Sequence, residues 1–234
     1  MIDKVLRDGF DRLGPDLPEA ALENYKSFYK YLVEKNKVMN LTAITGEEEF
    51  AKLHLLDCAA LLGAADFRRK RVIDVGTGAG FPGVPLKIAM SDMEITLLDS
   101  LGKRVDFLKD CCELLCFENV SCIHARAEEA PPELRENFDI AVSRAVAKLS
   151  MLCEICLPFV RVGGLFIAMK GPAPHEELKE AENAIITLGG EPQDIFEYLI
   201  PETDIRHTAV LIKKVKNTPE KYPRRFARIQ KSPL

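Results

Sequence analysis

Residues 72–83 read Val-Ile-Asp-Val-Gly-Thr-Gly-Ala-Gly-Phe-Pro-Gly: an apolar run with one acid, Asp74, and then a loop with Gly76, Gly78 and Gly80. Glycine is required where a backbone takes a positive φ or approaches a ligand closely, because a Cβ atom would clash in both cases. This stretch therefore predicts a strand, a loop that holds a small molecule, and a helix. The alternative is an ordinary strand-to-helix turn, since glycine also has purely steric uses.

The spacing of these glycines separates two kinds of nucleotide site. The dinucleotide fingerprint G-x-G-x-x-G would place a third glycine where this chain has Phe81, and it requires no acid inside the strand. The D-x-G-x-G-x-G pattern instead resembles motif I of the Rossmann-like S-adenosylmethionine (SAM)-dependent methyltransferases. The resemblance implies a SAM site that includes Asp74, Gly76, Gly78, Gly80 and Phe81.

A second apolar run ends in an acid, Asp99, 23 residues after Gly76. An acid at the end of the second strand of a βαβ unit binds ribose hydroxyls at about this separation. Asp99 is therefore predicted to bind the ribose, and the alternative is that it caps the following helix. Between the two runs, Pro82 and Pro85 fit a helix only in its first turn, so this helix should begin at about Pro82.

Short β-rich runs alternate with helical stretches through the middle of the chain. Alternation of this kind predicts an α/β fold with a mostly parallel sheet and helices on both faces. The last two runs flank residues 201–204 and should form a hairpin with an antiparallel last strand. The expected strands are 71–75, 94–99, 119–124, 138–143, 164–169, 195–200 and 208–215.

The chain divides into three expected regions. Residues 1–66 carry helical patterns, with one helix from Pro18 to about Met39 and another opened by a Thr45-x-x-Glu48 capping box. Residues 67–216 should form the SAM-binding domain, and residues 217–234 a basic C-terminal tail.

Composition indicates a soluble enzyme. The 234 residues, of which 47% are apolar, can bury one substantial core. There is no run of 18 apolar residues and no signal-like leader, so we expect a cytoplasmic protein without membrane association. Seven cysteines suggest reduced thiols, and the single C-x-x-C pair, Cys153 and Cys156, lies in a helical apolar pattern. We therefore expect no bound metal. A monomer is expected.

The charge reverses sign in the tail. Residues 213–234 contain eight basic residues and one acid, a net charge of +7, which leaves −11 for residues 1–212. A basic strip on an acidic body favours a polyanionic partner, because lysine and arginine displace phosphate counterions. Nucleic acid is the favoured partner, and the alternative is a solvated tail without one. Truncation before Lys221 is then expected to leave SAM affinity nearly unchanged.

Together, these stretches resemble the bacterial 16S ribosomal RNA guanine-N7 methyltransferase family, also called the glucose-inhibited division protein B family. The similarity extends over most of the chain, although Ala227 and Ile229 depart from the family's usual glycine and proline. Its motifs here are residues 40–44 (NLTAI), 54–57 (HLLD), 74–83, Ala127-Glu128, Ser143-Arg144-Ala145, Lys170-Gly171, 222–225 (YPRR) and 231–234 (KSPL).

The resemblance implies further site residues. Ala127 and Glu128 would border the adenine of SAM. Arg144 would sit at the end of the fourth strand and hold the methionine carboxylate or the guanosine, with a structural salt bridge as the alternative. Lys170 is a candidate RNA contact with a similar structural alternative. In the tail, the implied RNA contacts are Arg224, Arg225 and Lys231.

His54 and Asp57 lie three positions apart on an expected helix, hence on one face. Histidine suggests a general base. However, guanine N7 has a free lone pair and no proton, so its methylation requires no base. We therefore favour a hydrogen-bonded brace of the active-site floor formed by these two side chains.

The sequence thus predicts a SAM-dependent methyltransferase that acts on N7 of a guanosine in 16S ribosomal RNA, either naked or in a ribosomal particle. Catalysis should consist of positioning, with Arg144 as its main residue. The alternatives are a methyltransferase of another RNA or a small molecule, a nicotinamide-dependent oxidoreductase, and a non-catalytic ribosome-associated factor. Asp74 and Phe81 disfavour the oxidoreductase, the basic tail disfavours a small-molecule substrate, and intact cofactor motifs disfavour a non-catalytic factor.

Overall fold

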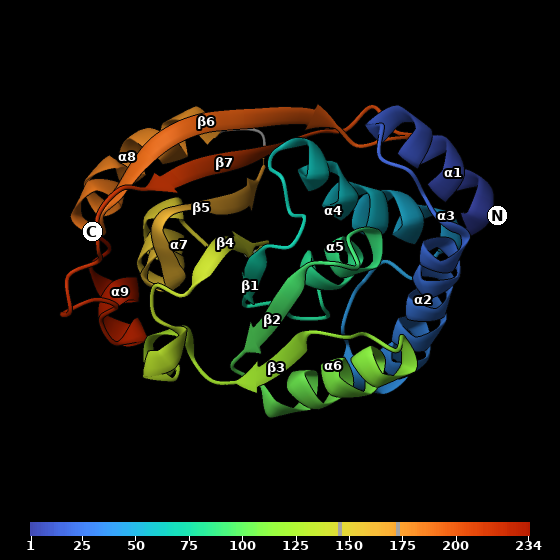
Figure 1. Ribbon diagram of the computed structural model, residues 1–234, viewed down its shortest axis with the longest axis horizontal. Helices are drawn as coiled ribbons and strands as arrows, with labels where there is room; N and C mark the ends of the chain where they lie inside the picture. Colours follow the sequence, from blue (N-terminus) through green and yellow to red (C-terminus); the bar gives the residue numbers. More distant parts are fainter. Residues whose placement is uncertain (145–146, 172–173) are drawn as a thin grey trace.

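A twisted seven-stranded sheet forms the centre of the computed structural model, which describes residues 1–144, 147–171 and 174–234 (Figure 1). Its order is β3-β2-β1-β4-β5-β7-β6, and β7 runs antiparallel to both of its neighbours. The predicted α/β fold, with a mostly parallel sheet and an antiparallel last strand, is confirmed. The strands are β1 (Arg71–Val75), β2 (Glu94–Asp99), β3 (Val120–His124), β4 (Phe138–Ser143), β5 (Val160–Lys170), β6 (Gly190–Leu199) and β7 (Arg206–Lys214).

Helices cover both faces of the sheet. The helices α5 and α6 lie on one face together with the N-terminal helices, and α7 and α8 pack against each other on the other. A π-helical turn, Ala51–Leu56, joins α3 to α4. The α-helices are α1 (Ile2–Leu13), α2 (Glu19–Met39), α3 (Glu47–Phe50), α4 (Asp57–Ala59), α5 (Gly83–Ala89), α6 (Gly102–Leu114), α7 (Leu149–Cys156), α8 (Pro174–Thr187) and α9 (Phe226–Lys231).

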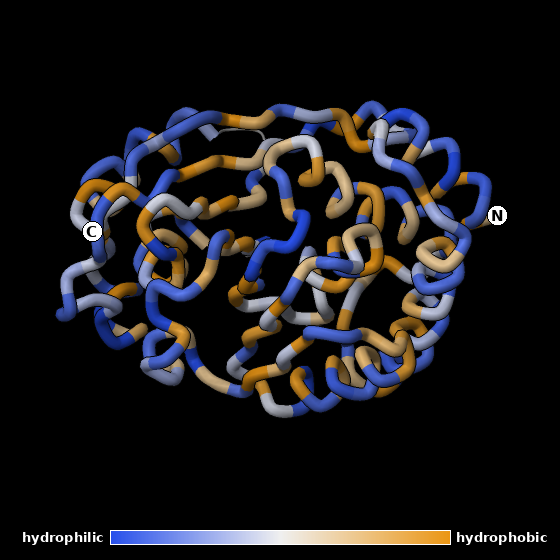
Figure 2. The backbone as a smooth tube through the Cα atoms, in the orientation of Figure 1, coloured by the Kyte–Doolittle hydropathy of each residue, from blue (hydrophilic) through white to orange (hydrophobic). Residues whose placement is uncertain are grey.

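The strands β1 to β5 and β7 contribute side chains to two hydrophobic cores. In β1, Val72 belongs to the core under α5 and α6, whereas the next residue, Ile73, belongs to the core under α7 and α8. Successive residues of a strand point to opposite faces, so a strand covered on both sides must be apolar throughout. Figure 2 shows the result: hydrophobic colour runs along the central strands, and hydrophilic colour predominates on the outer helices.

The N-terminal helices share the first of these cores. Leu22 and Phe28 of α2 are fully buried and pack in the same cluster as Leu97 of β2. The helix expected from Pro18 begins at Glu19. The predicted capping box was wrong: Gly46, not Thr45, is the N-cap of α3, and the cap has no side-chain hydrogen bond. The division at residue 66 remains a prediction.

The strands β5, β6 and β7 begin earlier than expected, at Val160, Gly190 and Arg206. Gly163 and Gly164 weaken the strand pattern of β5, yet a Cβ atom on Gly164 would lie 2.6 Å from the carbonyl oxygen of Asp139 on the neighbouring strand. Glycine there permits close packing beside the irregularity between β4 and β5. Pro192 lies within β6, which a proline tolerates because β6 is an edge strand of the sheet.

The strand order reverses between β1 and β4. The strand that follows β1 in the chain, β2, lies on one side of this pair, and the strand that follows β4, β5, lies on the other. In open α/β sheets the crevice beyond the carboxyl ends of the strands at this point is the ligand site. The loop after β1 and the segment that begins with Arg144 after β4 both start at this edge.

Candidate active site

A cavity of about 240 Å³ lies at the carboxyl ends of β1, β2 and β3. We call it the β1–β2 cavity. Four of the predicted cofactor residues meet there: Gly76, Asp99, Ala127 and Glu128. The residues of its wall that were not predicted include Ile155 and Phe226.

The glycine loop is shaped to admit a ligand. Gly76 has φ +72° and Gly78 has φ +61°, a region that favours glycine. A Cβ atom built on Gly76 would have no protein atom within 4 Å, so that side of the loop faces open space. Gly80 differs, because its Cβ would lie 2.7 Å from Val84 Cγ2 in α5. Thus Gly76 leaves room for SAM beside the loop, and Gly80 permits the helix α5 to pack close to the loop.

Two buried carboxylates hold this loop in place. Asp99 Oδ2 accepts a hydrogen bond of 2.9 Å from the Gly78 N–H, and Oδ1 accepts one of 2.9 Å from the Leu101 N–H. A carboxylate has about four acceptor positions, so Asp99 retains capacity for ribose hydroxyls. Asp74 is fully buried, and its Oδ2 accepts a hydrogen bond of 2.8 Å from the Gly83 N–H at the start of α5. Burial raises the Asp74 pKa to about 7.

Asp74 therefore supports the loop from beneath and does not line the β1–β2 cavity. Direct contact of Asp74 with the cofactor was expected and stays a prediction. Phe81 is also turned inward: its ring is 6% exposed and stacks on His54, with centroids 4.4 Å apart. The guanidinium carbon of Arg144 lies 4.5 Å from the centre of the Phe81 ring. Phe81 thus supports Arg144, and its side chain lines neither of the two cavities described in this section.

A second cavity, of about 530 Å³, lies beyond the ends of β4 and β5. We call it the β4–β5 cavity. Three predicted residues line it: Asp57, Arg144 and Lys170. His207, at the start of β7, lines it as well and was not predicted.

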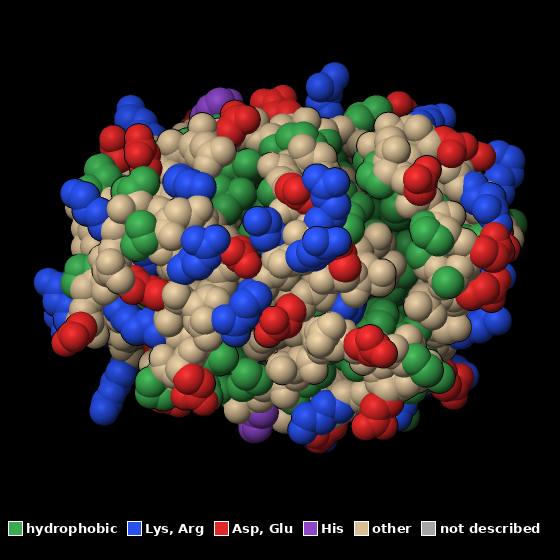
Figure 3. Space-filling model, viewed as in Figure 1, with side chains coloured by type: hydrophobic (Ala, Val, Ile, Leu, Met, Phe, Trp, Pro, Cys, Tyr) green, Lys and Arg blue, Asp and Glu red, His purple; other side chains and the backbone are tan. Residues whose placement is uncertain are grey.

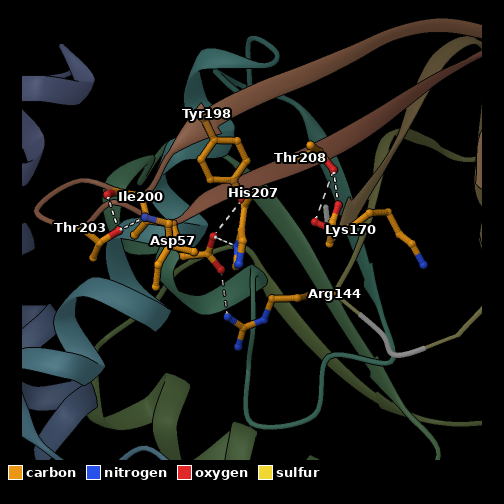
Figure 4. Close-up of polar contacts among 10 residues, drawn as sticks. Asp57, Arg144, Lys170, Tyr198, Ile200, Thr203, His207 and Thr208 are labelled. Carbon is orange, nitrogen blue, oxygen red and sulfur yellow. Dashed lines mark hydrogen bonds and ion pairs between the residues drawn. The ribbon is translucent and has the colours of Figure 1, made fainter. Parts of the chain in front are cut away.

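Asp57 is the polar centre of this cavity's wall (Figure 4). It is 2% exposed, and its Oδ1 accepts hydrogen bonds from the Tyr198 hydroxyl at 2.8 Å and from His207 Nδ1 at 2.9 Å. Its Oδ2 lies 3.5 Å from a terminal nitrogen of Arg144. The Asp57 hydrogen bond raises the His207 pKa. With Nδ1 so engaged, His207 presents its Nε2 edge as the remaining hydrogen-bonding group.

His54 and Asp57, which were predicted to brace the active-site floor through hydrogen bonds, have different hydrogen-bond partners, and their role as a brace stays a prediction. His54 Nε2 instead hydrogen-bonds with Thr42 Oγ1 at 2.8 Å. Burial lowers the His54 pKa to about 4, so the ring is neutral near pH 7. Because the His54 ring is neutral, buried and stacked on Phe81, it is suited to a structural role.

Two of the residues predicted to bind RNA have other partners. The Lys170 ammonium donates to the Ala147 carbonyl at 2.7 Å and pairs with Glu177 at 2.7 Å, and its side chain is 7% exposed. Arg224 forms two hydrogen bonds with the fully buried carboxylate of Glu154. Both cations are thus paired with neighbouring acids, and RNA binding by Lys170 and Arg224 stays a prediction.

The two other tail residues that were predicted to bind RNA are accessible. Arg225 and Lys231 are exposed, as the predicted RNA contacts require. Lys214, in contrast, is fully buried, and its ammonium donates to the Leu157 carbonyl and to Thr218. The tail's net charge therefore overstates its accessible charge. Its exposed cations, which we call the tail patch, are Lys216, Lys221, Arg225, Arg228 and Lys231.

The residues that were not predicted lie outside the quoted motifs. Tyr198 and His207 are directly paired across β6 and β7, so the hairpin register would have brought them together. Only the hairpin was predicted, without its register. Phe226 follows the Arg224-Arg225 pair, and nothing in the sequence placed it near β1. Ala145, part of the motif at the end of β4, lies outside the described residues.

Within residues 1–144, 147–171 and 174–234, no group of three or more His, Cys, Asp or Glu side chains could hold a metal ion. Cys153 and Cys156 are free thiols buried in the second core. The helices of this same part of the chain include none with the length and apolar character needed to cross a membrane.

Comparison of solved structures shows the fold. A SAM-dependent methyltransferase from Aquifex aeolicus aligns with a TM-score of 0.54 at 18% identity, covering 71% of this chain and 93% of that one. A SAM-dependent O-methyltransferase from Thermotoga maritima aligns with a TM-score of 0.52 at 15% identity, covering 81% and 73%. The fold is that of the class I SAM-dependent methyltransferases.

Sequence comparison is more specific. Ribosomal RNA small subunit methyltransferase G from Clostridium perfringens (strain SM101 / Type A) is 46% identical over 98% of both chains. The protein of the same name from Clostridium botulinum (strain ATCC 19397 / Type A) is 49% identical, also over 98% of both. The model of the family described as rRNA small subunit methyltransferase G matches residues 21–206. The chain therefore belongs to the rRNA small subunit methyltransferase G family.

Proposed function

We propose that this protein transfers a methyl group from SAM to N7 of a guanosine in small-subunit ribosomal RNA. One observation carries the proposal: a glycine-cradled cavity and a cavity lined by Arg144 and His207 open at the same edge of the sheet. The names of the relatives support ribosomal RNA as the substrate. Guanine N7 as the target rests on the family resemblance and on the chemistry of the second cavity.

The β1–β2 cavity suits SAM. Gly76 provides backbone without a side chain, Asp99 offers acceptors for the ribose hydroxyls, and the apolar Ala127 and Ile155 border space for the adenine. When bound, SAM supplies a methyl group on a positively charged sulfur. Asp99 and the loop it anchors would fix the position of that group relative to Arg144.

The β4–β5 cavity suits guanine. Next to N7, guanine carries the acceptor O6, to which the Arg144 guanidinium can donate and to which His207 Nε2 can donate when the ring is protonated. Met169, which also lines the cavity, offers apolar surface to a base. No general base is needed, because the N7 lone pair attacks directly. His54 is buried, neutral and engaged with Thr42, which agrees with catalysis by positioning.

The tail patch suits the phosphates of RNA. Its five exposed cations lie within residues 216–231 on a body of opposite net charge. Figure 3 shows basic side chains over the part of the surface where Figure 1 places α9. Lysine and arginine at such a surface gain from counterion release, which makes binding dependent on salt. A single chain would suffice for this arrangement, so we propose a monomer.

Nucleoside mapping tests the proposal. Ribosomal RNA from cells with and without the gene would be digested and assayed for 7-methylguanosine. We expect one 7-methylguanosine of small-subunit RNA to disappear with the gene and to return with the wild-type protein. Return with an Asp99→Ala variant at equal abundance, or an unchanged 7-methylguanosine map, would contradict the proposal. A changed small molecule with unchanged RNA would indicate a small-molecule methyltransferase.

A further inference from the structure

The C-terminal segment 218–231 is fastened to the body by buried contacts. Arg135 donates hydrogen bonds to the carbonyl oxygens of Thr218 at 2.6 Å and Tyr222 at 2.8 Å. Arg224 binds Glu154 of α7 through its backbone N–H and its guanidinium. A charged group as deeply buried as the Glu154 carboxylate requires a partner, so these contacts indicate a specific docked position.

Two buried apolar side chains also anchor the segment 218–231. Ile229 is fully buried, and Tyr222 is 7% exposed against the core beneath α7 and α8. Between these two side chains lies Phe226, the first residue of α9. Residues on both sides are therefore held, which restricts where the Phe226 ring can lie.

The Phe226 ring lies at the β1–β2 cavity. Phe226 lines it together with Ala127, Glu128 and Ile155, although it lies almost 100 residues further along the chain than Glu128. Its backbone N–H donates a hydrogen bond of 3.3 Å to Glu128 Oε1. Glu128, which was expected at the adenine, is thus shared between the cavity and the tail.

We propose that Phe226 is a cofactor-binding residue that forms the adenine-side wall of the SAM cavity, and that residues 218–231 act as a strap that positions it. The inference rests on the proposed function only in taking SAM as the ligand. An aromatic ring beside a base contributes stacking that an aliphatic wall would not. This arrangement reverses the expectation that removal of the tail leaves SAM affinity unchanged.

Calorimetric titration with S-adenosylhomocysteine, in the absence of RNA, tests the wall. Phe226→Ala should weaken binding by about 5- to 100-fold, the effect of losing one base–aromatic stack. Phe226→Tyr should bind within about twofold of the wild type, because it keeps the ring. Gln230→Ala is the matched control: it changes an exposed side chain of the same helix and should leave the affinity unchanged. Thermal unfolding without ligand would show that the variants fold.

A shortened chain tests the strap separately. A protein that ends at Arg225 keeps the Arg224–Glu154 anchor and loses Phe226, and it should bind as weakly as Phe226→Ala. Wild-type affinity in both folded variants would overturn the wall while leaving the proposed function intact. A wild-type protein that binds no S-adenosylhomocysteine would overturn both.

Discussion

Asp57 joins side chains from three distant parts of the chain at one carboxylate. Tyr198 and His207 donate to one oxygen, and Arg144 approaches the other. A buried carboxylate is stable only when such partners replace its lost hydration. Because Arg144 and His207 both line the β4–β5 cavity, Asp57 fixes the two groups that would face the guanine.

Asp57→Asn should lower the free energy of unfolding by about 2–4 kcal/mol, because a charged buried network loses its only anion. The His207 pKa should fall toward its ordinary value, since the hydrogen bond to Asp57 is what raises it. Urea unfolding and NMR titration of His207 would measure the two effects. Asp92→Asn, at an exposed site, is the control and should change neither. An unchanged free energy of unfolding and an unchanged His207 pKa in Asp57→Asn would show that the hydrogen bonds of Asp57 do not stabilise the fold.

His54 should make the protein less stable in mild acid. Its pKa is about 4 in the folded protein and about 6.5 in the unfolded chain, so between these values only the unfolded state binds the proton. Its contribution is therefore present above pH 6.5 and is lost as the pH falls toward 4. Between pH 7 and pH 5 the loss should be about 2 kcal/mol.

Urea unfolding of the wild type and of His54→Gln at both pH values measures this loss. The decrease in stability from pH 7 to pH 5 should be about 2 kcal/mol smaller in the variant. Equal decreases in the two proteins would show that His54 is protonated in the folded state, contrary to its burial.

At the scale of single residues, the sequence was informative where one residue type has few uses. Gly76 could be placed because only glycine suits a positive φ beside a ligand. Lys170 and Arg224 could not, because a cation in the sequence does not reveal whether an acid lies opposite. Their partners, Glu177 and Glu154, are near them only in the folded structure.

Among the elements, the glycine loop offers a direct test of two different uses of glycine. Gly80→Ala should cost about 1–3 kcal/mol of stability, because its Cβ would lie 2.7 Å from Val84 and the residue has φ +96°. Gly76→Ala meets no protein atom and should cost only about 1 kcal/mol, for its positive φ.

Binding separates the two variants. Gly76→Ala should bind S-adenosylhomocysteine at least about tenfold more weakly, because the new methyl group enters the cofactor space. Folded Gly80→Ala should bind S-adenosylhomocysteine with an affinity closer to that of the wild type. The interpretation of the loop as a cradle fails if Gly76→Ala binds normally, as calorimetry would show.

Elements were predictable where one strong local pattern decided them. The strand β1, the helix start at Pro82 and the terminal hairpin followed from apolar runs and proline positions. The Thr45 capping box failed because Thr45 directs its carbonyl to the Tyr29 hydroxyl in a loop that the rest of the fold shapes. The pairing of Tyr198 with His207 depended on register, which the loop of the hairpin fixes.

For the molecule as a whole, the net charge of −4 conceals an uneven distribution. Replacing Lys221, Arg225, Arg228 and Lys231 by Gln should weaken binding of small-subunit RNA or particles and lower the slope of log affinity against log salt. Each lost phosphate contact removes about 0.7–0.9 from that slope. Filter binding over a salt series measures it. A quadruple variant with a wild-type slope would show that the tail patch contacts no phosphate.

The most direct test of the account is the identity of the methylated atom. Purified protein would be incubated with labelled SAM and small-subunit RNA or particles that lack the modification, and the RNA would then be digested to nucleosides. We expect the label in 7-methylguanosine, with a single-turnover rate about a hundredfold lower for Arg144→Ala, because a loosely held guanosine loses alignment. Label in another nucleoside, or no transfer to either substrate, would contradict guanine-N7 methylation by this protein.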